Sequence, residues 1–332
     1  MRSTAILLAL AGGLLASLLV GILVGAVAIG PGDVLAALVG GAHGTTGTIV
    51  RDLRLPRVIA AAIVGASLAV AGVLLQGLTR NPLADPYVTG SSAGAALGAV
   101  IAIAAFGPLA GGIVPVAAFA GALVAVAAVW QLARLGGRTT VLTILLAGIV
   151  MTAFAGAVVT LLLVASDRLS LRIRAVLDVL IGAVTVGSPG ELSVAAIIVA
   201  IGIALALLVG PRVDAYAFGE ETAATLGVDT ERVTVVVLAA AALLAGASVA
   251  LAGLVGFVGL VVPHAVRTVV GARHRLLVAA SALAGAIVLV LADAGARVVL
   301  APAELPVGVI TGLVGAPFFV FLLVRSRQAT LV

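Results

Sequence analysis

The sequence contains no cysteine and no lysine, and each absence excludes a kind of chemistry. Without thiols the chain has no disulfides and no thiolate metal sites. Without lysine it cannot build the G-x-x-x-x-G-K-[ST] loop that cradles nucleotide phosphates. We also find no nucleophile–base arrangement and no cluster with metal-ligand spacing. The sequence therefore does not predict an enzyme, and any ATP that drives its function is bound by another chain.

Charged residues are scarce, at 9% of 332 residues, against about 25% in soluble domains. Hydrophobic residues make up 63%, with a mean hydropathy of +1.38, which is too apolar for a water-soluble fold to bury. A lipid bilayer accounts for this composition. No stretch is polar enough for an extramembrane domain, so we expect one all-α transmembrane domain over residues 1–332. The net charge of +5 does not indicate nucleic-acid binding, because the arginines lie at the ends of apolar segments.

Ten apolar segments follow one another along the chain, separated by arginine, glycine, proline and Asn-Pro punctuation. A shorter apolar piece at about 176–187 contains Asp178 and predicts a half-helix or surface helix. Arg2 and the Ala26-Val27-Ala28 run resemble a signal peptide, but the first apolar run is longer than a signal core, so we expect a retained span. The expected spans are 4–29, 58–78, 89–106, 113–135, 139–164, 191–209, 233–253, 255–271, 276–300 and 306–324.

Arginine placement predicts cytoplasmic N- and C-termini, because this orientation leaves the majority of the 18 arginines on the cytoplasmic side. The bias is moderate, since Arg51, Arg54 and Arg57 cluster before the second span, on the predicted outer side. Charge alone favours interfacial snorkelling for these side chains. Docking of acidic groups on a partner is the competing interpretation.

Two segments on the predicted cytoplasmic side attract attention. Residues 76–86 form a turn with two prolines beside Gln76, an ordinary turn or a candidate pore constriction. In the longest predicted cytoplasmic loop, about 212–232, Glu220 and Glu221 begin a predicted short helix that Gly227 ends. Ala223, Ala224 and Leu226 give this helix small and apolar faces, which a cytoplasmic partner would cover.

Two more segments lie later in the chain. Glycine at every third position of 253–259 and the later Pro263 predict a bend or break within the membrane. His264 could relay protons or bind metal, but a hydrogen-bonded structural histidine at a helix end is the interpretation we prefer. Asp293 and Arg297 lie four residues apart on one helix face, where an ion pair is affordable near the outer interface.

These segments, in this order, closely resemble the FecCD family, the permease subunits of importers for iron–siderophore complexes, haem and vitamin B12. The resemblance covers nearly the whole chain, and its most specific blocks are the Pro-His-x-x-Arg and Glu-Leu-Pro-Val-Gly motifs. The matching residues are Arg54-Leu-Pro-Arg57, Gln76, Asn81-Pro-Leu-Ala84, Pro86, Leu146-Ala-Gly148, Ala223 to Gly227, Gly256 to His264, Arg267, His274-Arg275, Asp293, Arg297, Glu304 to Gly308 and Gly315 to Phe319.

The resemblance implies a type II importer fold with ten transmembrane helices and both termini cytoplasmic. Two permeases, identical or paralogous, would pair around a translocation path, with two ATPase subunits below and a binding protein or lipoprotein above. Arg54, Arg57 and Arg297 match arginines that meet acidic residues of the binding protein. The ATPase-coupling element matches Gly219, Glu220, Glu221, Ala223, Ala224, Leu226 and Gly227, and the gate positions match Asn81, Leu83, Val141 and Leu142.

The expected mechanism is alternating access in the cytoplasmic membrane, with ATP and Mg²⁺ on the partner and no cofactor on this chain. The aromatic content of 3% fits a smooth, weakly binding path. We expect an iron(III)–siderophore complex as substrate, with haem or vitamin B12 as alternatives. A secondary transporter would need acidic or histidine residues at mid-membrane depth, but the only clear candidates, Asp293 and Arg297, are expected near an interface. A passive channel would need filter rings that we do not find.

Overall fold

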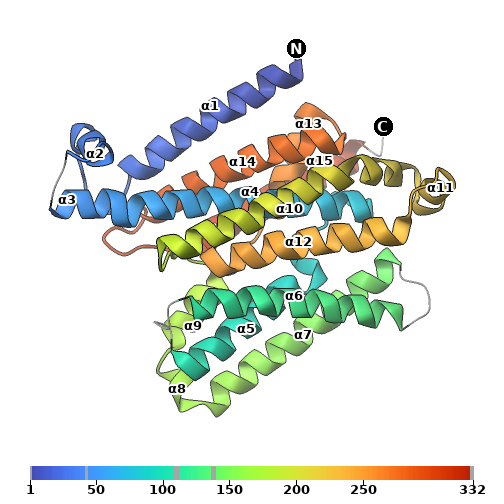
Figure 1. Ribbon diagram of the computed structural model, residues 1–332, viewed down its shortest axis with the longest axis horizontal. Coiled ribbons are helices and arrows are strands. Elements are labelled where there is room, and N and C mark those ends of the chain that lie inside the picture. The colour runs from blue at the N-terminus through green and yellow to red at the C-terminus, as the bar shows by residue number, and fades with distance from the viewer. Residues whose placement is uncertain (1, 42–43, 108–111, 136–139, 330–332) are drawn as a thin grey trace.

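The computed structural model describes residues 2–41, 44–107, 112–135 and 140–329, and these residues form helices and connecting loops without a β-strand (Figure 1). The fold is therefore all-α, as the sequence predicts. The elements are α1 (Arg2–Leu23), α2 (Pro31–Leu38), α3 (Thr45–Thr48), η1 (Ile49–Arg54), α4 (Leu55–Thr79), η2 (Pro86–Thr89), α5 (Ser91–Phe106), α6 (Ile113–Arg134), α7 (Val141–Ala165), α8 (Asp167–Ser170), α9 (Ile173–Ile181), α10 (Pro189–Val213), η3 (Asp214–Phe218), α11 (Glu220–Thr225), α12 (Thr230–Ala252), α13 (Val258–Val270), α14 (His274–Ala296) and α15 (Val307–Ala329).

Each expected span coincides with a helix, although residue 139, where one of them was expected to begin, lies outside the described residues. Seven helices of the described chain are long and apolar enough to cross a membrane, and α5, α13 and α15 are shorter apolar helices. Two helices end earlier than expected, α1 at Leu23 and α14 at Ala296. At the end of α1, the carbonyl groups accept hydrogen bonds from arginine side chains of other elements.

Helix α4 runs through the centre of the molecule and packs against α10, α12, α13 and α14. Its neighbours approach closely because glycines face each other at the crossings. A methyl group on Gly65 would overlap the backbone of Gly285 in α14, and one on Gly72 would overlap the carbonyl of Gly259 in α13. These contacts make α4 the element through which its neighbours are connected.

Helices α5, α6 and α7 form a second group beside this centre (Figure 1). Gly94 and Gly98 of α5 lie directly against Gly121 and Ala117 of α6, where any added side chain would overlap backbone atoms. Gly94 and Gly98 lie four residues apart on one face of α5, and such spacing of small residues lets helices pack closely where lipid provides no hydrophobic drive between them.

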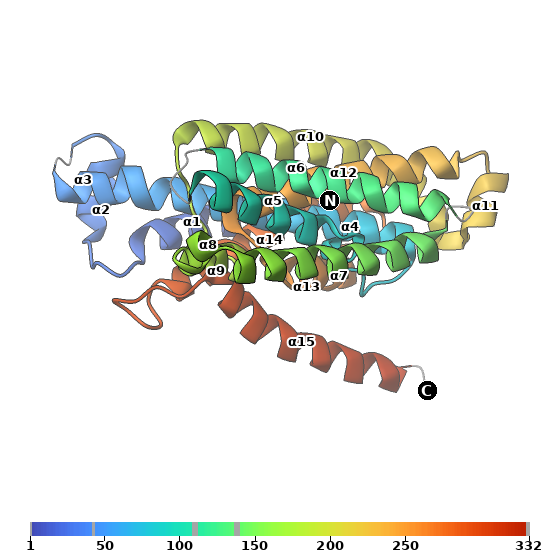
Figure 2. The same cartoon turned by 90° about the horizontal axis from the view of Figure 1, so that it is seen from below.

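The two ends of the molecule carry different elements (Figures 1 and 2). Helices α2 and α3 lie at one end, and α11 lies at the other. The N-terminal end of α1 lies in the half of the molecule that holds α11, and α15 leans away from the bundle toward the same half. The expected topology, with the 212–232 loop and both chain ends on the cytoplasmic side, stays a prediction.

Candidate functional site

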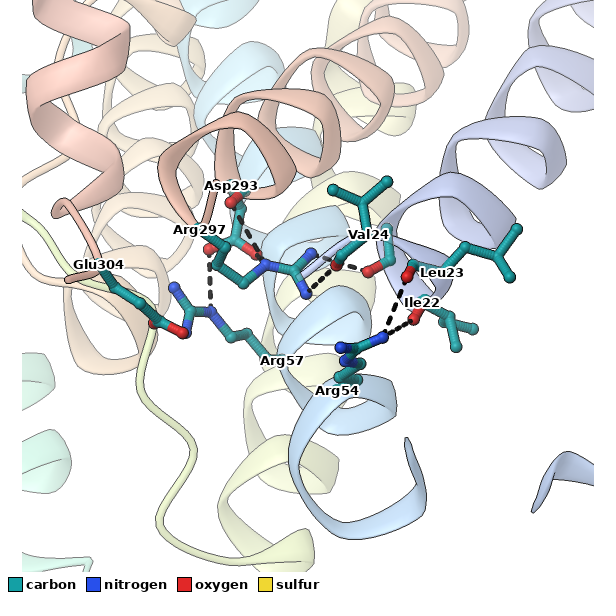
Figure 3. Close-up of polar contacts among 9 residues, drawn as sticks. Ile22, Leu23, Val24, Arg54, Arg57, Asp293, Arg297 and Glu304 are labelled. Atoms are coloured by element: carbon teal, nitrogen blue, oxygen red, sulfur yellow. Dashed lines mark hydrogen bonds and ion pairs between the residues drawn. The ribbon is translucent and has the colours of Figure 1, made fainter. Parts of the chain in front are cut away.

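Two arginines from other elements bind the carbonyl groups that end α1 (Figure 3). Arg54 ends η1, and Arg297 directly follows α14. The last carbonyls of a helix have no intrahelical donor, so the two guanidinium groups act as its C-terminal cap. Arg54 donates to the carbonyls of Ile22, Leu23 and Val27, and Arg297 to those of Gly21 and Val24. The four bonds to residues 21–24 measure 2.8 to 3.0 Å.

Two carboxylates complete this arginine cluster. Arg57 donates through Nε to Asp293 Oδ1 at 2.9 Å and through Nη1 to Glu304 Oε2 at 2.5 Å. Arg297 Nε lies 3.1 Å from Asp293 Oδ2, so the expected ion pair one helical turn apart is formed. The Asp293 side chain is 1% exposed and that of Glu304 is 42% exposed. Two arginines therefore neutralise one buried carboxylate, which alone would be costly.

Burial divides the three arginines for which the family resemblance implies partner docking. Arg54 and Arg297 are 6% and 3% exposed, and their donors are directed to backbone inside this chain. The Arg57 side chain is 22% exposed, and one of its two partners, Glu304, lies at the protein surface. A groove of about 340 Å³ opens beside all three. A partner carboxylate can therefore reach Arg57 by displacing Glu304, whereas the other two would have to leave the end of α1.

At the opposite end, residues 219–227 form the short helix that the sequence predicts. Gly219 has a φ of +105°, α11 follows, and Gly227 has a φ of +83°, so glycine fits both ends. Ala223 is fully buried and fixes the helix to the bundle. Phe218 and Leu226 are 73% and 66% exposed, which leaves two large apolar side chains uncovered beside the exposed Glu221. Such a surface suits burial against another protein.

Two side-chain anchors hold this segment to the transmembrane helices. The Asp214 carboxylate accepts from the backbone N–H of His274 at 3.0 Å and lies 2.6 Å from its Nδ1, at the first turn of α14. The Tyr216 hydroxyl donates to the carbonyl of Thr230, at the start of α12, at 2.9 Å. Hydrogen bonds therefore connect the residues that precede α11 to α12 and α14, both of which pack on α4.

Gln76 connects α4 to the first turn of α13, near Pro263, which lies inside that helix. Proline has no N–H, so the carbonyl of Gly259 lacks its intrahelical donor. The Gln76 amide donates to the carbonyls of Gly259 and Leu260 at 3.4 and 3.1 Å, and its oxygen accepts from Arg267 Nη2 at 3.1 Å. The predicted break precedes this helix: Phe257 has a φ of +68°, between α12 and α13.

The preferred interpretation of His264 needs correction. Pro263 lies inside α13, so His264 is within the helix and not at its end. Its Nδ1 is buried and has no hydrogen-bond partner among the described residues. Within the same residues no three His, Asp or Glu side chains lie together as a metal site requires.

The expected gate residues lie on the loop between α4 and α5 and at the start of α7. Asn81 Oδ1 accepts from the N–H of Leu83 at 2.9 Å, which makes the turn self-supporting. Val141 lines a small cavity together with Ala84, Asp85 and residues of α4, whereas Asn81 and Leu83 do not line it, so the role of these residues as a gate stays a prediction. Leu142 does not line this cavity and is 64% exposed.

Buried polar groups hold the rest of this loop. Burial raises the pKa of the Asp85 carboxyl, although the N–H of Tyr87 donates to it. Burial and the Asp85 charge likewise raise the pKa of Tyr87, whose hydroxyl accepts from the N–H of Val255 at 3.1 Å. The loop is thus bonded to the break that precedes α13.

Sequence reasoning did not find the anchors Asp214 and Tyr216 or assign His274 a role. The usable signal was a carboxylate and an aromatic side chain at the boundary between an apolar helix and a polar loop. Their partners, however, lie on helices whose proximity only the fold reveals.

The comparisons with known proteins agree with this geometry. The model of the FecCD transport family matches residues 13–325. The chain is 45% identical over 284 residues to the cobalamin import system permease protein BtuC of Halobacterium salinarum, covering 86% of this chain and 75% of that protein. It is 41% identical over 286 residues to the hemin transport system permease protein HmuU of Yersinia pestis, covering 83% of each.

Similarity extends to a permease with an iron(3+) substrate and to a solved structure. The Fe(3+)-citrate import system permease protein YfmD of Bacillus subtilis is 38% identical over 280 residues, covering 84% of this chain and 82% of that protein. A metal-chelate type ABC transporter solved in an inward-facing conformation superposes with a TM-score of 0.84 at 27% identity, covering 97% of this chain and 99% of that one.

Proposed function

The chain belongs to the FecCD transport family and is a permease subunit of an ATP-binding-cassette importer, and on that premise we propose that it forms the translocation path for a bulky metal chelate. It is a multi-pass membrane protein and not an enzyme, as its relatives are permease subunits. ATP and Mg²⁺ bind to a separate ATPase, and this chain carries no cofactor. We place it in the cytoplasmic membrane with both termini inside.

The observation that carries the mechanism is the anchored, apolar coupling segment, residues 214–228. Phe218 and Leu226 offer an uncovered surface to an ATPase, and Asp214 and Tyr216 connect that surface to α14 and α12. Closure of the ATPase dimer would pull this segment, shift the helices around α4 and open the two sides of the path in turn. A second permease chain, identical or paralogous, would complete the path.

At the other end we propose that a substrate-binding protein or lipoprotein docks through carboxylates onto Arg57. Arg54 and Arg297 would support this contact by fixing the end of α1. Direct contact of Arg54 and Arg297 with the binding protein stays a prediction. It would require both arginines to break their hydrogen bonds to the carbonyls at the end of α1 and to bind carboxylates of the partner instead.

For the substrate we propose a metal chelate of the tetrapyrrole class first, because the cobalamin and hemin permeases are 45% and 41% identical to this chain. An iron(III)–siderophore complex, the expectation from sequence, is the second candidate, since iron(3+)-hydroxamate and Fe(3+)-citrate permeases are 37% and 38% identical. Growth of a deletion strain decides between them. Failure to use cobalamin or haem with normal use of siderophores supports the tetrapyrrole assignment, and the reverse pattern overturns it.

The coupling assignment has its own test. We expect the double variant Glu220→Ala/Leu226→Asp to insert normally but to lose uptake, because the new carboxylate at position 226 would place a charge in the apolar contact with the ATPase. ATP hydrolysis by the assembled complex would no longer respond to substrate. Asp167→Ala/Leu171→Asp, a matched exposed pair outside the coupling segment, should transport normally. Normal uptake by the first variant would remove the coupling role.

A further inference from the structure

A groove of about 820 Å³ lies between the N-terminal half of α1 and the bundle. Its floor is apolar and includes Leu7 of α1, Leu207 of α10, and Leu276 and Ala279 of α14. Its rim is the turn between α13 and α14, which contributes Arg273 and Arg275, both exposed. The groove therefore joins a positively charged rim to a lipid-facing apolar floor.

The geometry of α1 explains why the groove exists. Arg54 and Arg297 fix the C-terminal end of α1, and near Gly13 the helix still lies close to Ile287 of α14. Beyond that point α1 diverges from α14 toward its N-terminus (Figure 1). In a membrane such a wedge cannot stay empty, because apolar walls lose packing contacts when nothing fills the space between them.

The rim is built to attract an anion. Arg273 and Arg275 flank the N-terminal residue of α14, where the helix dipole adds positive potential. The backbone between these two arginines is held in place, because His274, which lies between them, is hydrogen-bonded to Asp214. In the described part of the chain, neither guanidinium forms an ion pair and no acidic side chain lines the groove.

We propose that this groove binds an anionic phospholipid, with the phosphate between Arg273 and Arg275 and an acyl chain along Leu7, Leu207 and Leu276. Guanidinium groups pair with phosphate through charge-assisted hydrogen bonds, and basic pockets between transmembrane helices bind anionic headgroups. The neighbouring groove between α10 and α12 also has two arginines, Arg212 and Arg232, but Asp229 lines it as well and makes it less favourable for an anion. The proposal does not depend on which chelate is carried.

Native mass spectrometry of the purified full-length chain tests this site. Phosphatidylglycerol or phosphatidylcholine of equal chain length is added to the detergent solution, and the fraction of lipid-bound protein is measured. We expect phosphatidylglycerol to bind preferentially. Arg273→Gln/Arg275→Gln should weaken that binding about 25-fold, the factor that roughly 1 kcal/mol per arginine gives.

A filling variant and a charge control make the result decisive. Ala279→Phe, which fills the floor and leaves both arginines in place, should also abolish tight phosphatidylglycerol binding. Arg168→Gln/Arg174→Gln removes two exposed arginines elsewhere and should leave binding unchanged. Equal binding of phosphatidylcholine, an equal loss in the control, or undiminished binding by Ala279→Phe would each overturn the proposal.

Discussion

At the scale of single residues, the arginines near the end of α1 both satisfy backbone carbonyls and compensate the charge of a buried carboxylate. A guanidinium group can satisfy several backbone carbonyls and a carboxylate at once, because it presents five donors in a rigid fork. Arg297 does this for two carbonyls and Asp293. The positive charge that the sequence suggests for a partner is, for Arg54 and Arg297, used within the chain.

This burial predicts a stability effect. Replacing Arg297 by Gln leaves Asp293 with one of its two arginines and removes the donors to the carbonyls of Gly21 and Val24 at the end of α1. We expect a loss of about 3–5 kcal/mol in the free energy of unfolding, the usual cost of breaking a buried ion pair. Thermal unfolding of the purified chain in detergent measures it, with the exposed Arg174→Gln as control. Equal melting temperatures for the two variants would show that Arg297 is not a structural cap.

If the binding protein docks onto Arg57, substitutions of Arg57 and of its partner Glu304 should change the affinity for that protein in opposite directions. Arg57→Gln should weaken binding of the substrate-binding protein about tenfold, the scale of one charge-assisted hydrogen bond. Glu304→Gln should strengthen binding, because it removes the carboxylate that competes for Arg57. Dissociation constants at two salt concentrations measure both, and the salt dependence should shrink in Arg57→Gln. If both variants changed the affinity in the same direction, direct docking at Arg57 would be wrong.

Spacing in the sequence was enough to predict the Asp293–Arg297 pair, because residues four apart share a helix face. It could not predict Arg57 as the second partner of Asp293, since the two lie 236 residues apart in the chain. Nor could it predict that Gln76 donates a hydrogen bond to the carbonyl of Gly259, which lacks an intrahelical donor because of Pro263. The proline announces an unpaired carbonyl, but the donor comes from another helix.

At the scale of elements, hydropathy located every helix that was expected to span, because a bilayer demands long apolar runs. The break before α13 and the short helix α11 were also predictable, from glycine and proline positions. Helix neighbours were not, because small residues mark close packing without saying which helix approaches. Nothing in the sequence around Gly72, for example, indicates that it packs against Gly259.

The crossing of α4 and α13 predicts a marked contrast between two glycines. Gly72→Ala should destabilise the chain by about 1–3 kcal/mol, because the new methyl group would overlap the carbonyl of Gly259 and force the helices apart. Gly12→Ala, at a position with no atom near the added methyl, should be neutral or slightly stabilising. Melting temperatures in detergent compare the two. A neutral Gly72→Ala would mean that the crossing is loose.

At the scale of the whole molecule, one central helix, α4, connects the end proposed to dock the binding protein with the end proposed to couple to the ATPase. The arginine cluster fixes α1, α4 and α14 at one end, and Asp214 and Tyr216 fix the coupling segment to α14 and α12 at the other. Since these helices pack on α4, a displacement at the coupling end has a direct route to the opposite end. The resemblance stated from the sequence gave this general plan, and the fold supplies the contacts that would carry the motion.

The most direct measurement is uptake of the chelate into proteoliposomes that contain this permease, with and without its ATPase and binding protein. We predict uptake only when all components and hydrolysable ATP are present, and no uptake by the permease alone under a proton or sodium gradient. Gradient-driven transport by the permease alone, without the ATPase, would contradict the account.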